Sequence, residues 1–261
     1  FIYSTIFINT SFYFFIMLID IHCHLHHCYF NEDLDKVIDN ARKNNLKVIM
    51  TTGLDQKSNR KTLELAEKYD IVKGCLGIYP MKNLEFNIDE EIKFIEKNKN
   101  NIAAIGEIGL DYFWVKDNIK EQKELLGKMI SLAEKIDKPV IIHSRKAEED
   151  CIDMLASSKL KKIIMHCFTG KKEFVKKIID NGWFLTASTS IVRSQQFQDT
   201  AKTAPITQLF CETDAPYLSP FKGKRNEPAF VLESYKKLAE IKGMKLKEVV
   251  NNIWMNWQRL F

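Results

Sequence analysis

Residues 139–166 read PVIIHSRKAEEDCIDMLASSKLKKIIMH, and this stretch decides the fold. Apolar runs at 139–143 and 162–166 enclose a segment at 148–157 whose apolar residues recur at helical spacing. Neither apolar run alternates strictly with polar residues, which is typical of parallel strands that are buried on both faces. The stretch therefore predicts a strand, a helix and a second, parallel strand.

The same alternation continues in both directions along the chain. Short apolar runs predict strands at 18–22, 47–51, 72–78, 102–108, 139–143, 162–166, 182–186 and 208–212. Helical patterns begin near Asn31 and occupy 88–98, 118–137, 148–157, 171–181 and 229–242. This spacing suits βα units, so we predict an α/β protein that forms a single-domain (β/α)8 TIM-type barrel. An open, doubly wound sheet is the alternative, but no Gly-x-Gly-x-x-Gly follows the first predicted strand.

The predicted barrel spans residues 17–261, and residues 1–16 are expected to lie outside it. Residues 1–19 carry no charge, yet they lack the basic start and small-residue cleavage site of a signal peptide. Polar residues also interrupt the apolar run that a membrane span requires. We therefore expect Met17 to be the natural start and 1–16 to be extraneous upstream sequence, with an export or membrane element as the alternative.

The composition is that of a globular protein. Hydrophobic residues make up 45% and charged residues 28%, which excludes a disordered, collagen-like or coiled-coil chain. A net charge of +5 permits a nucleic-acid partner without requiring one. The 6 cysteines are scattered, so we expect reduced thiols in a cytoplasmic protein. No membrane association is expected, and no protein partner can be inferred.

Residues that commonly bind metals stand at the carboxyl ends of the predicted strands. They are His22, His24, Glu107, His143, His166 and Asp214. In a (β/α)8 barrel these ends converge on one mouth, where active sites form. Each residue alone is a weak signal, because a strand-end histidine is often a hydrogen-bonded core residue and Asp214 could belong to a turn before Pro216. Together they predict a metal centre.

The residue types indicate hydrolytic chemistry. Imidazole and carboxylate ligands suit Zn²⁺ and Mn²⁺, and carboxylates also hold Mg²⁺. We predict two divalent metal ions, with Glu107 as the bridge between them. A metal lowers the pKa of its bound water from 15.7 to about 7, and Asp214 could accept the proton of that water. Asp214 and Glu107 are therefore the predicted catalytic residues. A structural zinc site within 22–28 is disfavoured, because no second Cys pair has the required spacing.

Six stretches form a specific combination around these ligands. They are 17–25 (MLIDIHCHL), 105–112 (IGEIGLDY), 139–145 (PVIIHSR), 166–170 (HCFTG), 212–218 (ETDAPYL) and 256–261 (NWQRLF). In this order they resemble the TatD family of metal-dependent deoxyribonucleases, which have amidohydrolase-type barrels. The resemblance implies one divalent metal held by His22, His24, Glu107 and Asp214, and a second held by Glu107, His143 and His166.

The resemblance also implies a substrate and a reaction. Members of the family hydrolyse phosphodiester bonds in DNA, so we expect a 3′–5′ exonuclease that acts on single-stranded DNA through metal-bound hydroxide, with Mg, Mn or Zn. RNA is kept as an alternative polymer. One position departs from the family pattern: Tyr79 stands in Gly77-Ile78-Tyr79-Pro80, where a His is common. That departure puts in doubt a substrate contact or proton role at this position.

Substrate contacts are predicted at Arg145, Lys171, Arg225, Tyr112 and Tyr79. Guanidinium groups at the mouth would match phosphate oxygens. Lys171 opens a helix whose free N–H groups favour an anion, although a solvated helix face would carry the same lysines. Tyr112 begins Tyr112-Phe113-Trp114, where a ring could stack on a base or pack as a lid over the barrel.

Two other functions remain open. Another amidohydrolase-type hydrolase, such as a lactonase, a phosphotriesterase-like enzyme or a deaminase, can share the His-x-His pair and the late Asp. Some of these enzymes bridge their metals with a modified Lys where this chain has Glu107. A non-catalytic binding module with the same barrel is disfavoured, because all six ligand residues are present.

Overall fold

The computed structural model describes residues 17–82 and 84–261, so the expectation for residues 1–16 lies outside the described residues. Within them, parallel strands form one 8-stranded sheet in the order β1 to β8. The strands are β1 (Leu18–Cys23), β2 (Leu46–Thr52), β3 (Val72–Leu76), β4 (Ala104–Asp111), β5 (Val140–Arg145), β6 (Ile163–Met165), β7 (Phe184–Ser188) and β8 (Leu209–Glu212). The predicted (β/α)8 TIM-type barrel is confirmed.

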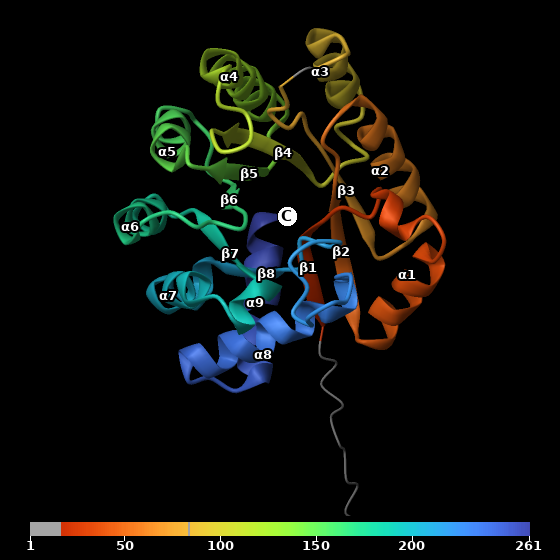
Figure 1. Cartoon of the computed structure of the whole chain (residues 1–261), viewed down its shortest axis with the longest axis vertical. Coiled ribbons are helices and arrows are strands. Elements are labelled where there is room, and N and C mark those ends of the chain that lie inside the picture. The colour runs from red at the N-terminus through yellow and green to blue at the C-terminus, as the bar shows by residue number, and fades with distance from the viewer. Residues whose placement is uncertain (1–16, 83) are drawn as a thin grey trace, which may run out of the picture.

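Most of the helices surround the strands on the outside of the barrel, and the last helix lies behind the strands, at one end of the barrel (Figure 1). They are α1 (Leu34–Lys43), α2 (Gln56–Lys68), α3 (Ile88–Lys97), α4 (Ile119–Ile136), α5 (Glu148–Ala156), α6 (Lys172–Asp180), α7 (Gln195–Thr203), α8 (Val231–Lys242) and α9 (Leu246–Leu260). Short 3₁₀ turns are η1 (Cys28–Phe30), η2 (Thr189–Val192), η3 (Ile206–Gln208) and η4 (Pro228–Phe230). Within the described ranges, none of the helices has the length and apolar character needed to span a membrane.

Among the described helices, α2, α7 and α9 were not predicted from apolar spacing. The inward face of α2 buries Ser58, Asn59 and Thr62 together with Leu65. The Asn59 amide donates to the carbonyl oxygen of Gly77 at 2.9 Å, and its side-chain oxygen accepts from the Gly77 N–H at 3.1 Å. A helix that is held to the barrel by polar contacts has little apolar periodicity to detect.

Strands β4 and β5 extend beyond their predicted ends. Residues 109–111 pair with residues 143–145 in parallel register. Gly109 has a φ of +149°, and a Cβ built there would lie 1.9 Å from the carbonyl oxygen of His143. Glycine is the residue that fits both the backbone conformation and the close approach of the strands. The extended pairing brings the ends of these two strands together at the mouth.

Side chains and backbone close the barrel between β1 and β8. The Asp20 carboxylate accepts hydrogen bonds from the backbone N–H and the hydroxyl of Thr213. Beyond β8, the N–H of Asp214 donates to the carbonyl oxygen of His22 at 2.9 Å. The N–H of His24 donates to the carbonyl oxygen of Ala215 at 2.8 Å. These bonds place Asp214 beside both histidines.

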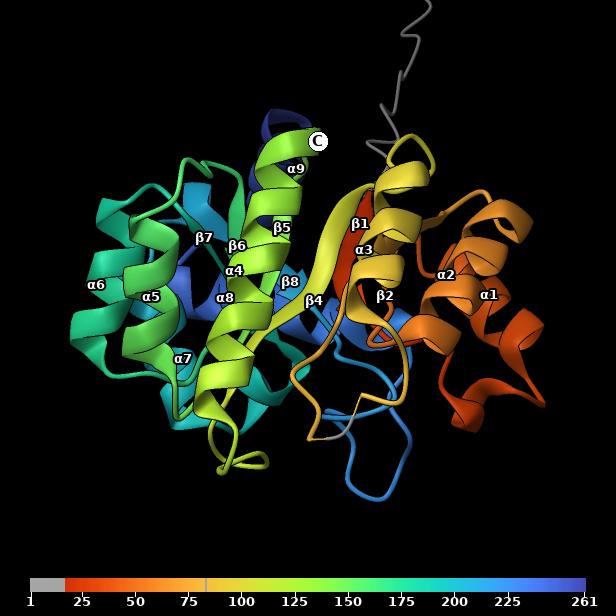
Figure 2. The same cartoon turned by 90° about the horizontal axis from the view of Figure 1, so that it is seen from above.

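Long loops extend from one end of the barrel, and the C-terminus lies at the other end. In Figure 2 the loops that follow β3, β4 and β8 extend at the bottom, whereas the C-terminus lies at the top. Helix α9 is tied to the start of β8, because the Asn256 amide donates to the carbonyl oxygens of Ile206 and Leu209 at 2.9 and 2.8 Å. The carboxyl ends of the strands, which bear the candidate ligands, therefore face away from the end of the chain.

Candidate metal centre

Two groups of potential ligand atoms meet at the carboxyl ends of the strands. One group consists of His22, His24 and Asp214, and the other of His22, Glu107 and His166. The ligand atoms of each group lie within 4.8 Å of one another. His143 joins the second group, because its Nδ1 lies 3.0 Å from Oε1 of Glu107. The structure thus brings all six predicted ligands together.

Glu107 lies between two pairs of histidines, with one carboxylate oxygen facing each pair. Its Oε2 is 3.4 Å from Nε2 of His22 and 3.5 Å from Nε2 of His24. Its Oε1 lies 3.0 Å from Nδ1 of His143 and 3.1 Å from Nε2 of His166. The predicted bridging role requires this arrangement, since each oxygen then serves a different cation.

The spacing of the first group fits a divalent cation. Oδ1 of Asp214 lies 3.5 Å from Nε2 of His22 and 3.3 Å from Nε2 of His24, and the two Nε2 atoms are 3.2 Å apart. Four tetrahedral ligands about 2.1 Å from a zinc ion would be about 3.4 Å from one another. The donor set therefore fits a metal both in its chemistry and in its separations.

The candidate ligands are buried together, and their charges shift one another's pKa. Burial disfavours the ionised form of Glu107, but the charge of His166 and hydrogen bonds from the neighbouring histidines hold the pKa of this carboxyl well below its usual range. Burial opposes protonation of His166, yet Glu107 and Glu212 raise the pKa of its imidazole well above the ordinary value. The Glu107 carboxyl is therefore ionised, as a metal ligand must be.

Two acidic residues without a predicted role stand behind the histidine ligands. Oδ2 of Asp111 lies 3.0 Å from Nε2 of His143. Oε2 of Glu212 lies 3.6 Å from Nδ1 of His166. Both of these atoms are buried, and neither has a hydrogen-bond partner. A carboxylate behind a ligating histidine fixes the orientation of the ring. The alternation of side chains along β4, from Glu107 to Asp111, is the signal that could have identified Asp111.

A cavity of about 660 Å³ opens above the ligands. It is lined by His24, Leu54, Tyr79, Glu107, Trp114, His143, Ser144, Arg145, His166, Cys167, Thr169, Phe197, Asp214, Tyr217 and Leu218. Two of the predicted substrate contacts, Arg145 and Tyr79, are in this lining. The Tyr79 hydroxyl donates to Oδ2 of Asp111 at 2.7 Å and lies 3.2 Å from Nε2 of His143. Tyr79 therefore stands beside the second ligand group.

Two other predicted substrate contacts are engaged elsewhere and do not line this cavity. The Tyr112 hydroxyl donates to the carboxylate of Asp150 at 2.7 Å. The Arg225 guanidinium pairs with both carboxylate oxygens of Asp33, at 2.9 and 2.7 Å. The ion pair occupies the Arg225 guanidinium that was predicted to meet a phosphate, and the hydrogen bond joins Tyr112, whose segment was predicted to stack on a base, to α5.

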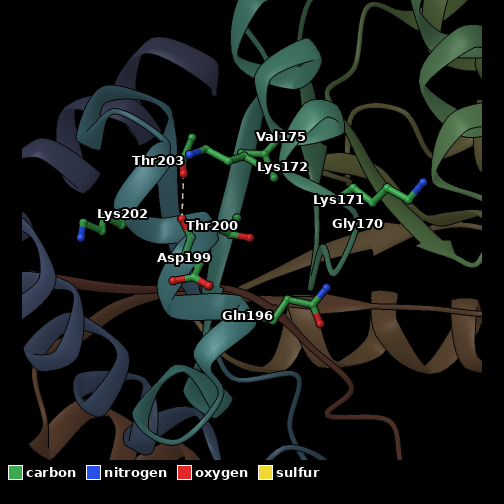
Figure 3. Close-up of a pocket in the computed structure, with 9 residues that line it drawn as sticks. All are labelled: Gly170, Lys171, Lys172, Val175, Gln196, Asp199, Thr200, Lys202 and Thr203. Carbon is green, nitrogen blue, oxygen red and sulfur yellow. Dashed lines mark hydrogen bonds between the residues drawn. The ribbon is translucent and has the colours of Figure 1, made fainter.

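Lys171 lines a separate pocket of about 780 Å³ between α6 and α7 (Figure 3). In Figure 3 the side chains of Lys171 and Lys202 point away from each other. Asp199 adds a carboxylate to the same lining. The pocket therefore does not surround one phosphate with positive charge, and its lysines are arranged like a solvated helix face.

Comparison with known proteins identifies the family. The chain matches the family described as TatD related DNase over residues 19–261. A metal-dependent hydrolase of Methanocaldococcus jannaschii, MJ1582, is 36% identical, with 93% of this chain and 96% of that protein covered. The human protein named deoxyribonuclease TATDN3 is 33% identical, with 94% of each chain covered. The crystal structure of YJJV, a TatD homologue of Escherichia coli, has a TM-score of 0.87 at 26% identity and covers 94% of this chain and 97% of its own. This chain therefore belongs to the TatD-related DNase family of metal-dependent hydrolases.

Proposed function

We propose that this protein is a 3′–5′ exonuclease that hydrolyses phosphodiester bonds of single-stranded DNA with two divalent cations. The observation that carries the proposal is the position of Glu107, whose two oxygens face separate ligand groups. Paired cations suit the clamping of the attacking and leaving oxygens of a phosphodiester. The name of the human relative, deoxyribonuclease TATDN3, supports DNA as the polymer.

The predicted ligands divide between the two cations. His22, His24, Glu107 and Asp214 would hold the first, and Glu107, His143 and His166 the second. The mixture of imidazole and carboxylate donors suits Zn²⁺, Mn²⁺ or Mg²⁺. Cations bound there would neutralise charge on the phosphodiester and lower the pKa of water near the scissile bond.

Asp214 is the proposed proton acceptor for the attacking water. It lines the cavity, and burial opposes its ionisation. Hydrogen bonds and charge from His22 and His24 nevertheless hold the pKa of its carboxyl below the usual range, so that it is ionised at neutral pH. A carboxylate in this position can accept a proton as the phosphodiester is attacked.

Arg145 is the proposed phosphate contact. It follows His143 by two residues on β5 and lines the same cavity. Its guanidinium carbon lies 4.1 Å from the centre of the Phe113 ring, which supports the side chain from one face. A guanidinium held in this way can bind two oxygens of one phosphate.

Product mapping on a 5′-labelled single strand tests the proposal. With the metal-loaded protein we expect a ladder of labelled products that shortens from the 3′ end. The same strand with a 3′ label should release one labelled mononucleotide first. Internal cuts or release from the 5′ end would contradict the polarity, and an equal rate on the matching RNA would broaden the substrate class. Hydrolysis of a lactone or phosphotriester without cleavage of DNA would favour the other amidohydrolase activities.

A further inference from the structure

Exposed aromatic rings are concentrated around the mouth of the metal cavity. Among the described residues, the exposed large hydrophobic side chains include Tyr29, Phe113, Trp114, Tyr217 and Phe221. All of these lie in the segments that follow β1, β4 and β8. Rings gathered at one exposed place usually mark a surface that binds a partner or ligand. These segments leave the carboxyl ends of their strands, where the candidate ligands also lie, which associates the rings with the substrate.

Two of these rings line the cavity itself, from different loops. Trp114 follows β4 and is 68% exposed, and Tyr217 follows β8 and is 48% exposed. The centre of the Tyr217 ring lies 6.3 Å from that of His24. The guanidinium carbon of Arg145 lies 5.2 Å from the centre of the Trp114 ring. Within the cavity lining, Trp114 thus lies beside Arg145, and Tyr217 lies near His24.

The Trp114 loop is tied to the second ligand group through Asp111. Oδ1 of Asp111 accepts hydrogen bonds from the N–H groups of Phe113 and Trp114, both at 2.8 Å. The other oxygen of the same carboxylate contacts Nε2 of His143. The carboxylate that positions a metal ligand therefore also positions the loop that carries the ring.

The Tyr217 loop is tied to the first ligand group through its backbone. The N–H of Tyr217 donates to the carbonyl oxygen of Asp214 at 2.9 Å. The carbonyl oxygen of Tyr217 accepts from the side-chain amide of buried Asn226 at 2.6 Å. The backbone of each ring-bearing residue is thus tied to a different ligand group.

We propose that Trp114 and Tyr217 are stacking platforms for two unpaired nucleobases, one on each side of the scissile phosphate. This inference rests on the proposed function and deepens it, because it names the parts of the substrate that the protein binds. Every base has a face that stacks on an aromatic ring, so the binding should be tolerant of sequence. A base inside a duplex is already stacked on both faces, so the rings select unpaired ends.

Abasic substrates combined with ring variants test the inference. Each base next to the scissile phosphate is replaced in turn by an abasic residue in a single-stranded oligonucleotide. Kd is measured by fluorescence anisotropy with hydrolysis-resistant phosphorothioate linkages at the 3′ end, and KM by cleavage of normal linkages. For the metal-loaded wild type, each replacement should weaken binding roughly 5- to 150-fold, the range found when a stacking ring is removed.

The Trp114→Ala and Tyr217→Ala variants should bind the intact strand more weakly than the wild type, by the same factor as an abasic replacement. Their kcat should change less than their KM. Each variant should then be insensitive to one of the two abasic replacements, because the lost ring and the lost base belong to the same contact. Trp114→Phe and Tyr217→Phe, which keep a ring, should restore most of the binding. Wild-type Kd in both alanine variants, or a penalty for both abasic strands that persists in both variants, would overturn the inference.

Control variants separate stacking from other effects. Phe261→Ala removes a ring that is 38% exposed at the opposite end of the barrel, and it should leave Kd and KM unchanged. Metal content and melting temperature should match the wild type in every variant, because the substituted rings are exposed. A blunt duplex of the same sequence should bind more weakly than the single strand, and equal binding would count against selection of unpaired bases.

The two proposals fail in different ways. If the wild type binds the strand with the expected abasic penalties but does not cleave it, the stacking inference stands and the exonuclease proposal fails. If the wild type trims DNA while both alanine variants bind normally, the stacking inference fails and the exonuclease proposal stands. If the wild type neither binds nor cleaves any strand, both are overturned.

Discussion

Glu107 faces both groups of ligands, so its removal should affect both cations. We expect Glu107→Ala to lose bound metal at both sites and to lower kcat/KM by more than about 1,000-fold, since a metal contributes several kcal/mol to such reactions. Metal analysis and the labelled-strand assay measure the two effects. Glu90→Ala, on the exposed face of α3, is the matched control and should behave as the wild type. Activity that survives in Glu107→Ala would end the bridging proposal.

Asp111 should control the second cation without binding it. Asp111→Asn keeps an oxygen for the N–H groups of Trp114 and its neighbour but replaces the oxygen that faces His143 with an amide. We expect the second metal to bind 10- to 100-fold more weakly, as is typical when the partner of a ligating histidine is lost. Calorimetric titration of the metal-free protein resolves the two sites. The control is Asp150→Asn, at a carboxylate that pairs with Lys123, and it should leave the affinity of both metal sites unchanged. Equal weakening of both sites by Asp111→Asn would contradict the role of Asp111 at the second site.

The candidate ligands His24 and His143 should make metal affinity depend on pH. In the metal-free protein burial opposes their protonation, but Asp214 and Glu107 raise the pKa of His24 above its ordinary 6.5. Asp111 and Glu107 likewise raise the pKa of His143. A histidine releases its proton when it binds a metal, so affinity should rise with pH through and beyond 6.5. Calorimetry in two buffers of different ionisation enthalpy should detect proton release at pH 7, and its absence would contradict the prediction.

The positions of the candidate ligands were predicted, whereas the residues that act through another side chain were not. Glu107 and His143 end apolar runs, so strand geometry alone places them at the mouth. Asp111 lies beyond the predicted end of β4, and its role depends on where His143 lies in space. Tyr112 was favoured over Trp114 as a substrate contact, but its bond to Asp150 draws its hydroxyl elsewhere. The conformation of the loop determines which of these neighbouring aromatic side chains faces the cavity, and a sequence pattern does not specify that conformation.

At the scale of elements, the close approach of β4 and β5 depends on Gly109. We expect Gly109→Ala to lower the free energy of unfolding by at least about 2 kcal/mol, because its Cβ would collide with the backbone of His143 and the backbone would be strained. Metal binding should weaken as well, since the two strands carry Glu107 and His143. Chemical denaturation and metal titration measure both effects.

Gly127→Ala is the matched control for that substitution. A Cβ at Gly127, on α4, meets nothing within 4 Å. Alanine favours a helix over glycine by roughly 0.5–1 kcal/mol, so this variant should be as stable as the wild type or slightly more stable. If the two alanine variants were destabilised equally, the close approach of β4 and β5 would not be the cause.

The strands were predictable as elements because they are apolar on both faces. Several helices were predictable because their inward faces are apolar, although α9, whose inward face is also apolar, was not predicted. Helix α1 buries Val37, Ile38 and Ala41, and its spacing is evident in the sequence. Helix α7 buries Thr200 beside Phe197 and Ala201, so its short inward face gives a weaker signal. Hydrogen bonds and small residues position such helices, so the periodicity of apolar residues does not reveal where these helices lie.

For the whole molecule, the candidate ligands come from five strands at one end of the barrel, so metal bound there should stabilise the fold. Free metal at 100 times its Kd contributes about 2.7 kcal/mol, which for a chain of this length corresponds to roughly 5–10 °C in Tm. Chelation should lower the Tm of the metal-loaded protein by about this amount in scanning calorimetry. Glu107→Ala should show no such shift, and an unchanged Tm after chelation of the wild type would contradict metal-linked stability.

Helix α9 is fastened to the start of β8, at the end of the barrel opposite the cavity. A flexible tether attached at Phe261 would therefore hold the molecule on a bead or sensor chip with its mouth facing the liquid. Long polymers could then reach the candidate metal centre without passing between the protein and its support. The geometry thus favours immobilisation through the final residue for repeated rounds of turnover and washing.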